Sequence, residues 1–309
     1  MKRFFVILFF ATALNSVLAQ STYNFLRLDQ SPRAAALAGS FVANNDDPNV
    51  MFYNPAGISY LDEKPISFSF TKHLLDINSA SLAYSQKIEG IGRFSAGLQY
   101  YNYGNFIKAD EFGTKTGEFG VNDFAATIGY ANELDQNFYY GANVKFIYSG
   151  IADRSSVGLA VDLGLHYSIP DSRWNFGFSI LNLGSQVTQY YSTSESLPLD
   201  IRLGISKTLA HLPFTFYASL NKLNDDQENF ADRFKQFTIG GEFKMSKVVR
   251  LRFGYDNEKR KELKVGTSAG LAGFNLGVGI LVNNYNVDYA FSSMGFIGAI
   301  HRIGISTVL

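Results

Sequence analysis

Large apolar side chains and small or polar ones alternate without a break in the stretch Val157-Gly-Leu-Ala-Val-Asp-Leu-Gly-Leu-His-Tyr167. Successive side chains of a β-strand point to opposite faces, so this pattern predicts a strand with one apolar and one polar face. Strands in soluble sheets usually have about 5–6 residues, whereas tilted strands that cross a bilayer have about 9–11. The length of this stretch therefore favours a strand that crosses a membrane.

The same alternation recurs from residue 65 onward, for example over residues 66–70, 174–180, 214–220, 237–243 and 276–280. A soluble β-sandwich also alternates, and it remains the alternative fold. The second face, however, carries glycines together with charges in mid-strand, which suits the polar lumen of an outer-membrane barrel. These charged residues are Asp123, Lys145, Asp162, Arg202, Glu242, Lys244, Arg250, Arg252, Asp288 and Arg302. We predict an all-β transmembrane barrel over residues 65–309.

Connection lengths give the expected topology, because bacterial barrels alternate short periplasmic turns with longer external loops. After an expected third strand at residues 93–103, the connections are long at 104–120, 184–199 and 222–233 and short at 133–136, 170–173, 209–212 and 245–247. Residues 150–154 form an intermediate case. If residues 256–273 are a further external loop, the chain forms fourteen antiparallel strands and ends in the periplasm.

The first nineteen residues have the form of a secretory signal peptide. Lys2 and Arg3 precede an apolar run at residues 4–14, and the small-residue pattern before the cleavage site ends at Ala19. A membrane helix is the alternative, but the run is shorter than the ~20 residues that span a bilayer. We expect export through the Sec pathway and an outer-membrane location.

Composition argues against several other classes of function. The 27 basic and 27 acidic residues balance, so nucleic acid is not an expected partner, and the chain has no cysteine. Four histidines are scattered, which predicts no metal site and no cofactor. Ser69-Phe-Thr-Lys72 matches a motif of penicillin-recognising enzymes, but that motif needs a helix and these residues end a predicted strand. We therefore expect no enzymatic activity.

Residues 20–64 contain no convincing strand. An Ala-rich patch at residues 32–39 is followed by turn-forming residues 44–49 and by Tyr53-Asn-Pro-Ala-Gly57. Apolar residues in this segment need a surface to pack against, and inward-facing glycines of the barrel would leave room for it. We predict an N-terminal plug, or hatch, inside the barrel, with a loose periplasmic tail as the alternative.

The run at residues 33–48, followed by Asn54, Pro55, Ala56 and Gly57 ahead of a barrel, resembles the FadL/PorV-type outer-membrane superfamily, in which an Asn-Pro-Ala signature marks the hatch. The strand at residues 288–291 and the ending at residues 301–304 most resemble the PorQ-like family of the type IX secretion system in Bacteroidetes-type Gram-negative bacteria. This resemblance implies a surface complex with PorU, PorV-like and PorZ proteins, which attaches secreted cargo to lipopolysaccharide.

Two functions follow as hypotheses. In the first, the barrel is a non-enzymatic anchor for that complex, in contact with outer-membrane lipid and lipopolysaccharide. Its loops would hold a partner through aromatic and acidic residues, namely Phe106, Phe112, Phe119, Tyr190, Tyr191, Asp225, Asp226 and Glu228. The alternative is a FadL-like transporter for hydrophobic small molecules. The polar inward faces of the predicted strands favour the anchor.

Overall fold

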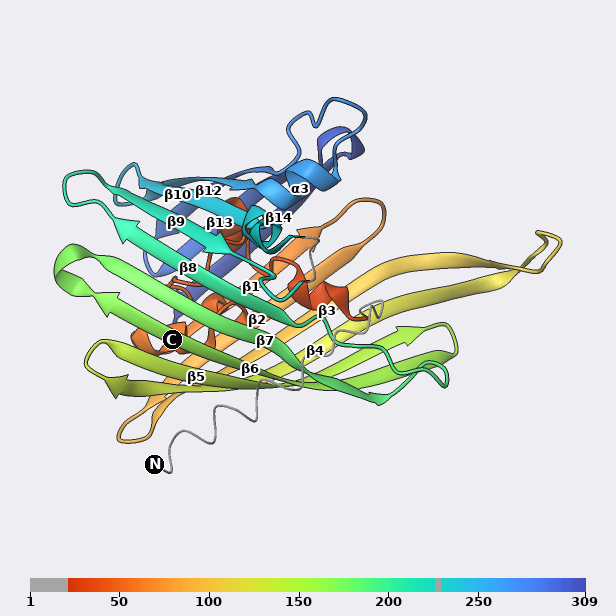
Figure 1. The fold of residues 1–309 in the computed structure, drawn as a ribbon, viewed down its shortest axis with the longest axis horizontal. Coiled ribbons are helices and arrows are strands. Elements are labelled where there is room, and N and C mark those ends of the chain that lie inside the picture. Colours follow the sequence, from red (N-terminus) through yellow and green to blue (C-terminus); the bar gives the residue numbers. More distant parts are fainter. Residues whose placement is uncertain (1–21, 226–228) are drawn as a thin grey trace.

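A computed structural model describes residues 22–225 and 229–309, so the expected signal peptide lies outside the described residues. Within them the chain forms a closed antiparallel barrel, in which β1 pairs with β2 and also with β14 (Figure 1). The strands are β1 Pro65–Lys72, β2 Asn78–Ile88, β3 Gly92–Ala109, β4 Lys115–Asp135, β5 Phe138–Ile151, β6 Arg154–Ile169, β7 Trp174–Thr188, β8 Asp200–Thr208, β9 Phe214–Leu220, β10 Phe237–Lys244, β11 Val249–Asp256, β12 Phe274–Val282, β13 Tyr285–Ser293 and β14 Ala299–Val308. The fourteen-stranded antiparallel barrel expected from the sequence is confirmed.

Alternation separates an apolar outer surface from a polar interior. In β6, Leu159, Val161 and Leu163 are exposed on the outside, whereas Asp162 and His166 are fully buried. The other strands follow the same rule, with exposed Ile128 and Val144 on neighbouring β4 and β5. An outward belt of this kind suits contact with lipid, and the inward face is built from Ser, Thr, Asn, Gly and charged residues.

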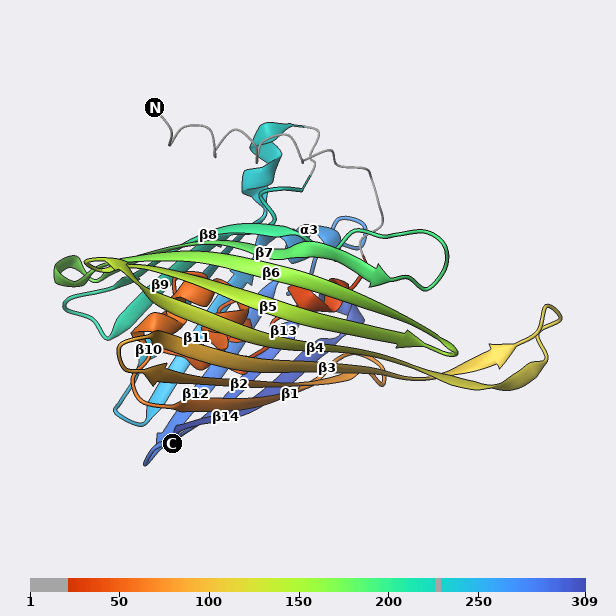
Figure 2. The same ribbon diagram turned by 90° about the horizontal axis from the view of Figure 1, so that it is seen from below.

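The two rims of the barrel differ, as the connection lengths predicted. The turn rim carries tight connections such as residues 136–137 and 283–284, and the loop rim carries residues 189–199, 221–225, 229–236 and 257–273. Two of the sequence predictions were wrong at the loop rim. Residues 104–120 are mostly strand, because β3 and β4 continue past the barrel as a projecting hairpin, and residues 152–153 form a tight turn (Figure 2).

Residues 22–64, which we call the N-terminal segment, lie inside the barrel and are surrounded by its strands in both ribbon views (Figures 1 and 2). The segment folds into η1 Asn24–Arg27, α2 Pro32–Ala36, η2 Pro48–Phe52 and η3 Pro55–Tyr60. Elsewhere short helices occur as η4 Pro170–Ser172, η5 Phe230–Lys235, α3 Asn257–Glu262 and η6 Gly295–Ile297. Among the described residues, none of these helices has the length and apolar character to cross a membrane.

Candidate functional site

Close contacts join the N-terminal segment to inward-facing glycines. A Cβ atom added to Gly164 of β6 would lie 2.1 Å from Oδ1 of Asn54, and one added to Gly254 of β11 would lie 2.5 Å from the backbone nitrogen of Ala38. Real Cβ atoms do not approach other atoms so closely, so only glycine fits at these positions. Gly129 differs from the expectation, because the nearest atoms there belong to Asn143 and Ser95 of the barrel itself.

Helix α2 begins at a cap and ends after five residues, because the backbone turns left-handed at Ala38 and Gly39 with φ of 56° and 74°. Ser31 caps the helix by accepting a hydrogen bond from the backbone nitrogen of Ala34 at 3.1 Å, and Pro32 occupies the first helical position. The alanines are fully buried. Their small side chains let the helix backbone approach the wall at β11, β12 and β13.

A buried ion network fixes this helix to the wall. The Nε atom of Arg33 lies 3.0 Å from Oε2 of Glu242, and the same oxygen lies 2.6 Å from Nε of Arg252. Arg33 also pairs with Asp46 at 2.8 Å, and Arg252 pairs with Asp288. Burial alone would lower the pKa of Arg33, but the Asp46 and Glu242 carboxylates raise it well above its ordinary value. The Arg33 guanidinium therefore stays charged at physiological pH.

The predicted hatch motif forms the start of η3, where each of its residues has a structural role. Asn54 is fully buried and caps η3 by accepting a hydrogen bond from the Ala56 nitrogen at 3.1 Å. Its Nδ2 atom donates to the carbonyl oxygens of Val42 at 2.9 Å and of Leu165 in β6 at 3.0 Å. Pro55 occupies the first helical position, and Gly57 leaves space for the Val50 side chain, 2.6 Å from its added Cβ. Asn54 thus ties two parts of the N-terminal segment to the wall.

Replacement of Asn54 by alanine is expected to lower the free energy of unfolding by about 2–3 kcal/mol, since the variant loses a helix cap and two hydrogen bonds to the carbonyl oxygens of Val42 and Leu165. Limited proteolysis in detergent should then cut the N-terminal segment faster than in the wild-type protein. Asn45→Ala is the matched control, because Asn45 is partly exposed and its side chain donates to that of Asn175 at 3.2 Å. Equal proteolysis of the two variants would contradict this role for Asn54.

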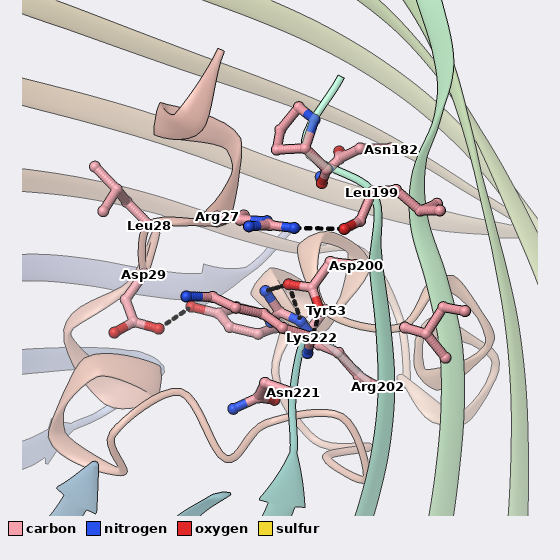
Figure 3. Close-up of polar contacts among 12 residues, drawn as sticks. Arg27, Leu28, Asp29, Tyr53, Asn182, Leu199, Asp200, Arg202, Asn221 and Lys222 are labelled. Atoms are coloured by element: carbon pink, nitrogen blue, oxygen red, sulfur yellow. Dashed lines mark hydrogen bonds and ion pairs between the residues drawn. The ribbon is translucent and has the colours of Figure 1, made fainter. Parts of the chain in front are cut away.

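A polar cavity of about 310 Å³ lies at the loop rim, between the N-terminal segment and strands of the second half of the barrel. Figure 3 shows its polar contacts: Arg27 donates to the carbonyl oxygen of Leu199 at 2.5 Å, and Tyr53 donates to Asp29 at 3.2 Å. On the wall, Asp200 pairs with Arg202 at 2.6 Å. We call this space the polar cavity; its walls carry charges of both signs.

An aromatic cleft of about 520 Å³ lies elsewhere on the loop rim, over β4 to β7. Three of the candidate partner residues, Phe119, Tyr190 and Tyr191, line it together with Arg154. The Arg154 guanidinium stacks 4.3 Å from the centre of the Tyr191 ring, and Phe106 stacks on Phe119 with 5.5 Å between the ring centres. The structure therefore brings together aromatic residues that lie up to 85 positions apart in the sequence, from Phe106 to Tyr191.

An apolar cluster adjoins the aromatic cleft, and three of its eight buried members belong to the start of the N-terminal segment. Its buried members are Tyr23, Phe25, Leu26, Tyr101, Ala125, Ile147, Ala160 and Leu197. Gln186 connects the two features, because it lines the cleft and donates to Ser156 at 3.0 Å, while Ser156 is hydrogen-bonded to the Tyr23 hydroxyl at 2.5 Å. Hydrogen bonds thus connect the cleft to Tyr23 of the N-terminal segment and to the apolar cluster that contains it.

The remaining candidate residues lie apart from the cleft. Phe112 is at the tip of the projecting hairpin and is 85% exposed. Asp225 is only partly exposed and pairs with Arg27 of the N-terminal segment at 3.2 Å, so it contributes an internal contact. Asp226 and Glu228 lie outside the described residues. Sequence reasoning did not single out Tyr23 or Arg27, because no local motif marks a residue whose partners are more than a hundred positions away.

Comparison with solved structures supports the assignment of the fold. The Ralstonia pickettii toluene transporter TbuX is similar with a TM-score of 0.58 and 13% identity, over 89% of this chain and 96% of that chain. A Pseudomonas aeruginosa FadL homologue is similar with a TM-score of 0.58 and 10% identity, over 90% and 98%. The Pseudomonas putida toluene transporter TodX gives 0.58 and 14%, over 90% and 97%. The chain has the FadL-type barrel fold.

Identities this low establish the fold alone. No family model and no curated protein sequence matches the chain. The FadL-type fold extends over nearly the whole of each transporter and about nine-tenths of this chain. The function of this chain must therefore be argued from the side chains of its own barrel.

Proposed function

We propose that this FadL-type barrel lies in the outer membrane of a Gram-negative bacterium and admits small hydrophobic molecules. The aromatic cleft is the entry point, and the N-terminal segment is the hatch that closes the lumen. The proposal rests on the position of the cleft next to the apolar cluster that contains Tyr23 and Phe25, to which the hydrogen-bonded pair Gln186 and Ser156 joins it. Two of the similar structures are those of toluene transporters, which agrees with an aromatic entry site. No catalytic step is part of the proposal.

The outward surface supports the proposed location. Exposed apolar side chains alternate with buried polar ones along the strands, and aromatic residues such as Trp174 and Phe176 stack near the turn rim with 6.0 Å between ring centres. Outer-membrane barrels have an apolar belt of this kind with aromatic residues at the membrane interfaces. In this orientation the loop rim faces the outside and the C-terminus lies in the periplasm.

The positions of the aromatic residues explain how a ligand would bind in the cleft and then move inward. Flat aromatic faces at Tyr191 and Phe119 attract planar or apolar molecules by stacking and by release of water. A molecule that leaves the cleft inward meets Tyr23, whose hydroxyl is hydrogen-bonded to Ser156 at 2.5 Å. Passage would require that residues near Tyr23 move, because they fill the space below the cleft.

Uptake of radiolabelled toluene tests the proposal in a Gram-negative host that lacks its own barrel for hydrophobic compounds. We expect faster uptake with the wild-type protein than with an empty vector. The double variant Phe119→Ala/Tyr191→Ala should lose most of this gain, at least about fivefold at low concentration, because the two lost aromatic contacts together cost about 1–3 kcal/mol. Phe112→Ala is the matched control, because Phe112 is an exposed aromatic residue of the same hairpin that does not line the cleft. Uptake no faster than with the empty vector would refute the proposal.

The second candidate is the anchor of a surface complex, as the resemblance to the PorQ-like family implies. One observation favours it: the β3–β4 hairpin projects beyond the barrel and exposes Phe106, Ile107 and Phe112 (Figure 2). Exposed apolar side chains on such an extension are typical of partner contacts. Affinity isolation from the native outer membrane tests this candidate. Co-purification that Phe112→Ala abolishes while toluene uptake stays at the empty-vector level would transfer the assignment to the anchor.

A further inference from the structure

The polar cavity at the loop rim holds one arginine whose charge is not balanced by a neighbouring side chain. Arg302 belongs to β14, lines the cavity and is only 4% exposed. Its NH1 atom donates to Oγ of Ser292 at 2.9 Å, and its Nε atom is buried without a hydrogen-bond partner. Within residues 22–225 and 229–309, no carboxylate oxygen lies within 4.0 Å, the limit of an ion pair, of an Arg302 nitrogen.

The other cations of the cavity contrast with Arg302, because each has a carboxylate partner. They are Arg202 with Asp200 at 2.6 Å, Lys222 with Glu258 at 2.7 Å, Lys259 with Asp256 at 3.2 Å and Arg27 with Asp225 at 3.2 Å. A buried cation without a partner is costly, so proteins rarely keep one without a use. The position of Arg302 beside an open cavity points to a partner that arrives from outside.

The walls of the cavity restrict the chemistry of that partner. Asp29, Asp256 and Glu258 line the same space, so a ligand with two negative charges would be repelled. Thr238, Gln236 and Asn221 supply polar groups, which suit a ligand with its own hydrogen-bonding groups more than a hydrocarbon. A volume of about 310 Å³ equals roughly ten water molecules in the liquid, which fits a small organic molecule.

We propose that the polar cavity binds a small, polar monocarboxylate and that Arg302 holds its carboxylate group. A guanidinium group presents two parallel N–H donors that match the two oxygens of a carboxylate. Arg302 has donors left for this contact, because among the described residues its side chain donates only from NH1 to Ser292. The N-terminal segment forms part of the cavity through Ala38 and Gly39, so the ligand would rest directly on the hatch.

This inference goes beyond the proposed function and does not depend on it. The aromatic cleft lies over β4 to β7, whereas Arg302 lies on β14. Failure of toluene uptake would leave the carboxylate site in place, and failure of carboxylate binding would leave the hydrophobic route in place. The two sites are therefore tested by separate ligands and separate variants.

Isothermal titration of the full mature protein in detergent tests the site with lactate, acetate and glycolate as probes. We expect saturable binding of at least one of these monocarboxylates. Lactamide, which has the shape of lactate without its charge, should bind at least about tenfold more weakly, because it cannot form charge-assisted hydrogen bonds with Arg302. Inorganic phosphate, at a pH where it carries two negative charges, should also bind at least about tenfold more weakly, because Asp29, Asp256 and Glu258 repel the second charge. Arg302→Gln should weaken carboxylate binding by at least about tenfold, and Arg302→Lys should retain part of it.

Arg93→Gln is the matched control, because Arg93 is also a buried arginine without a carboxylate partner among the described residues. It donates to the carbonyl oxygen of Glu63 and to Ser85, each at 3.0 Å, close to the turn rim. We expect normal carboxylate binding in this control and a thermal unfolding temperature of Arg302→Gln that is no lower than that of the wild-type protein. The proposal is overturned if none of the three monocarboxylates binds, if Arg302→Gln binds as tightly as the wild type, or if phosphate or lactamide binds as tightly as lactate.

Discussion

Deletion of residues 33–57 is expected to turn a barrel that conducts few ions into an open pore. These residues include α2, η2 and the hatch motif, all of which pack against the inner wall. The wall itself is polar, because its inward face includes Glu242, Arg252 and Asp288. Water and ions can replace the N-terminal segment along such a surface. Conductance of single channels in planar bilayers should therefore rise many-fold.

A second deletion serves as the control for this experiment. Removal of residues 106–118 shortens the projecting β3–β4 hairpin, which lies beyond the barrel rim (Figure 2). Its conductance should equal that of the intact protein. Both deletion proteins must migrate on gels as folded barrels before heating. If the variant without residues 33–57 folds and conducts no more than the intact protein, the N-terminal segment does not close the lumen.

The Glu242→Ala substitution should lower the free energy of unfolding by about 3 kcal/mol, a large loss for a single side chain. Glu242 is 1% exposed and contacts both Arg33 at 3.0 Å and Arg252 at 2.6 Å. Removal of one member of a buried ion pair costs about 3–5 kcal/mol, since the remaining charge loses its partner. The lower value applies because Arg33 retains Asp46 and Arg252 retains Asp288.

Denaturant unfolding in detergent measures this loss, and protease cleavage within residues 22–64 reports the release of the segment. Glu89→Ala is the matched control, because Glu89 is 86% exposed and pairs with Lys87 at 3.3 Å. Exposed pairs contribute about 0–1 kcal/mol, so the control should unfold like the wild type. A Glu242→Ala protein with wild-type stability and wild-type protease resistance would show that the ion network does not hold the segment.

The strand pattern of this barrel could be predicted from the sequence because burial in the wall imposes a strict alternation. The expected strand at residues 274–282 coincides with β12. The pattern failed where both faces of a strand meet solvent. Residues 104–109 and 115–120 continue β3 and β4 outside the barrel, and neither side is under pressure to be apolar. Their sequence therefore looks like that of a loop.

The candidate site could be predicted only in part. The Asn-Pro-Ala-Gly motif is local, so it could be singled out from the sequence, but the cap that Asn54 forms on η3 was not predicted. The bulge in β7 could not be predicted from the sequence. There Asn182 has a positive φ of 60° in the middle of the strand, and the register with β6 shifts. The cavity around Arg302 was also missed. Its special feature is a buried arginine that lines an open cavity and, among the described residues, has no carboxylate partner; only the three-dimensional positions of residues far apart in sequence reveal that.

We expect that the N-terminal segment must move before a hydrophobic molecule can pass through the barrel. The chain has no cysteine, so two introduced cysteines can lock the segment to the wall. A Cβ atom added to Gly240 would lie 3.0 Å from Cβ of Leu37 and 2.9 Å from the Leu37 carbonyl oxygen, and a disulfide needs about 3.5–4.5 Å between Cβ atoms. The segment must therefore move slightly away from the wall to form the bond, and the single Gly240→Cys variant measures the effect of the added side chain alone.

This lock can be tested in cells that express the Leu37→Cys/Gly240→Cys double variant. Toluene uptake by these cells is measured before and after reduction of the disulfide with dithiothreitol. The two single-cysteine variants control for the substitutions themselves. We expect uptake at the level of the empty vector in the oxidised double variant and recovery after reduction. Equal uptake in the oxidised and reduced states, with the disulfide verified by mass spectrometry, would contradict the claim that the N-terminal segment is the gate.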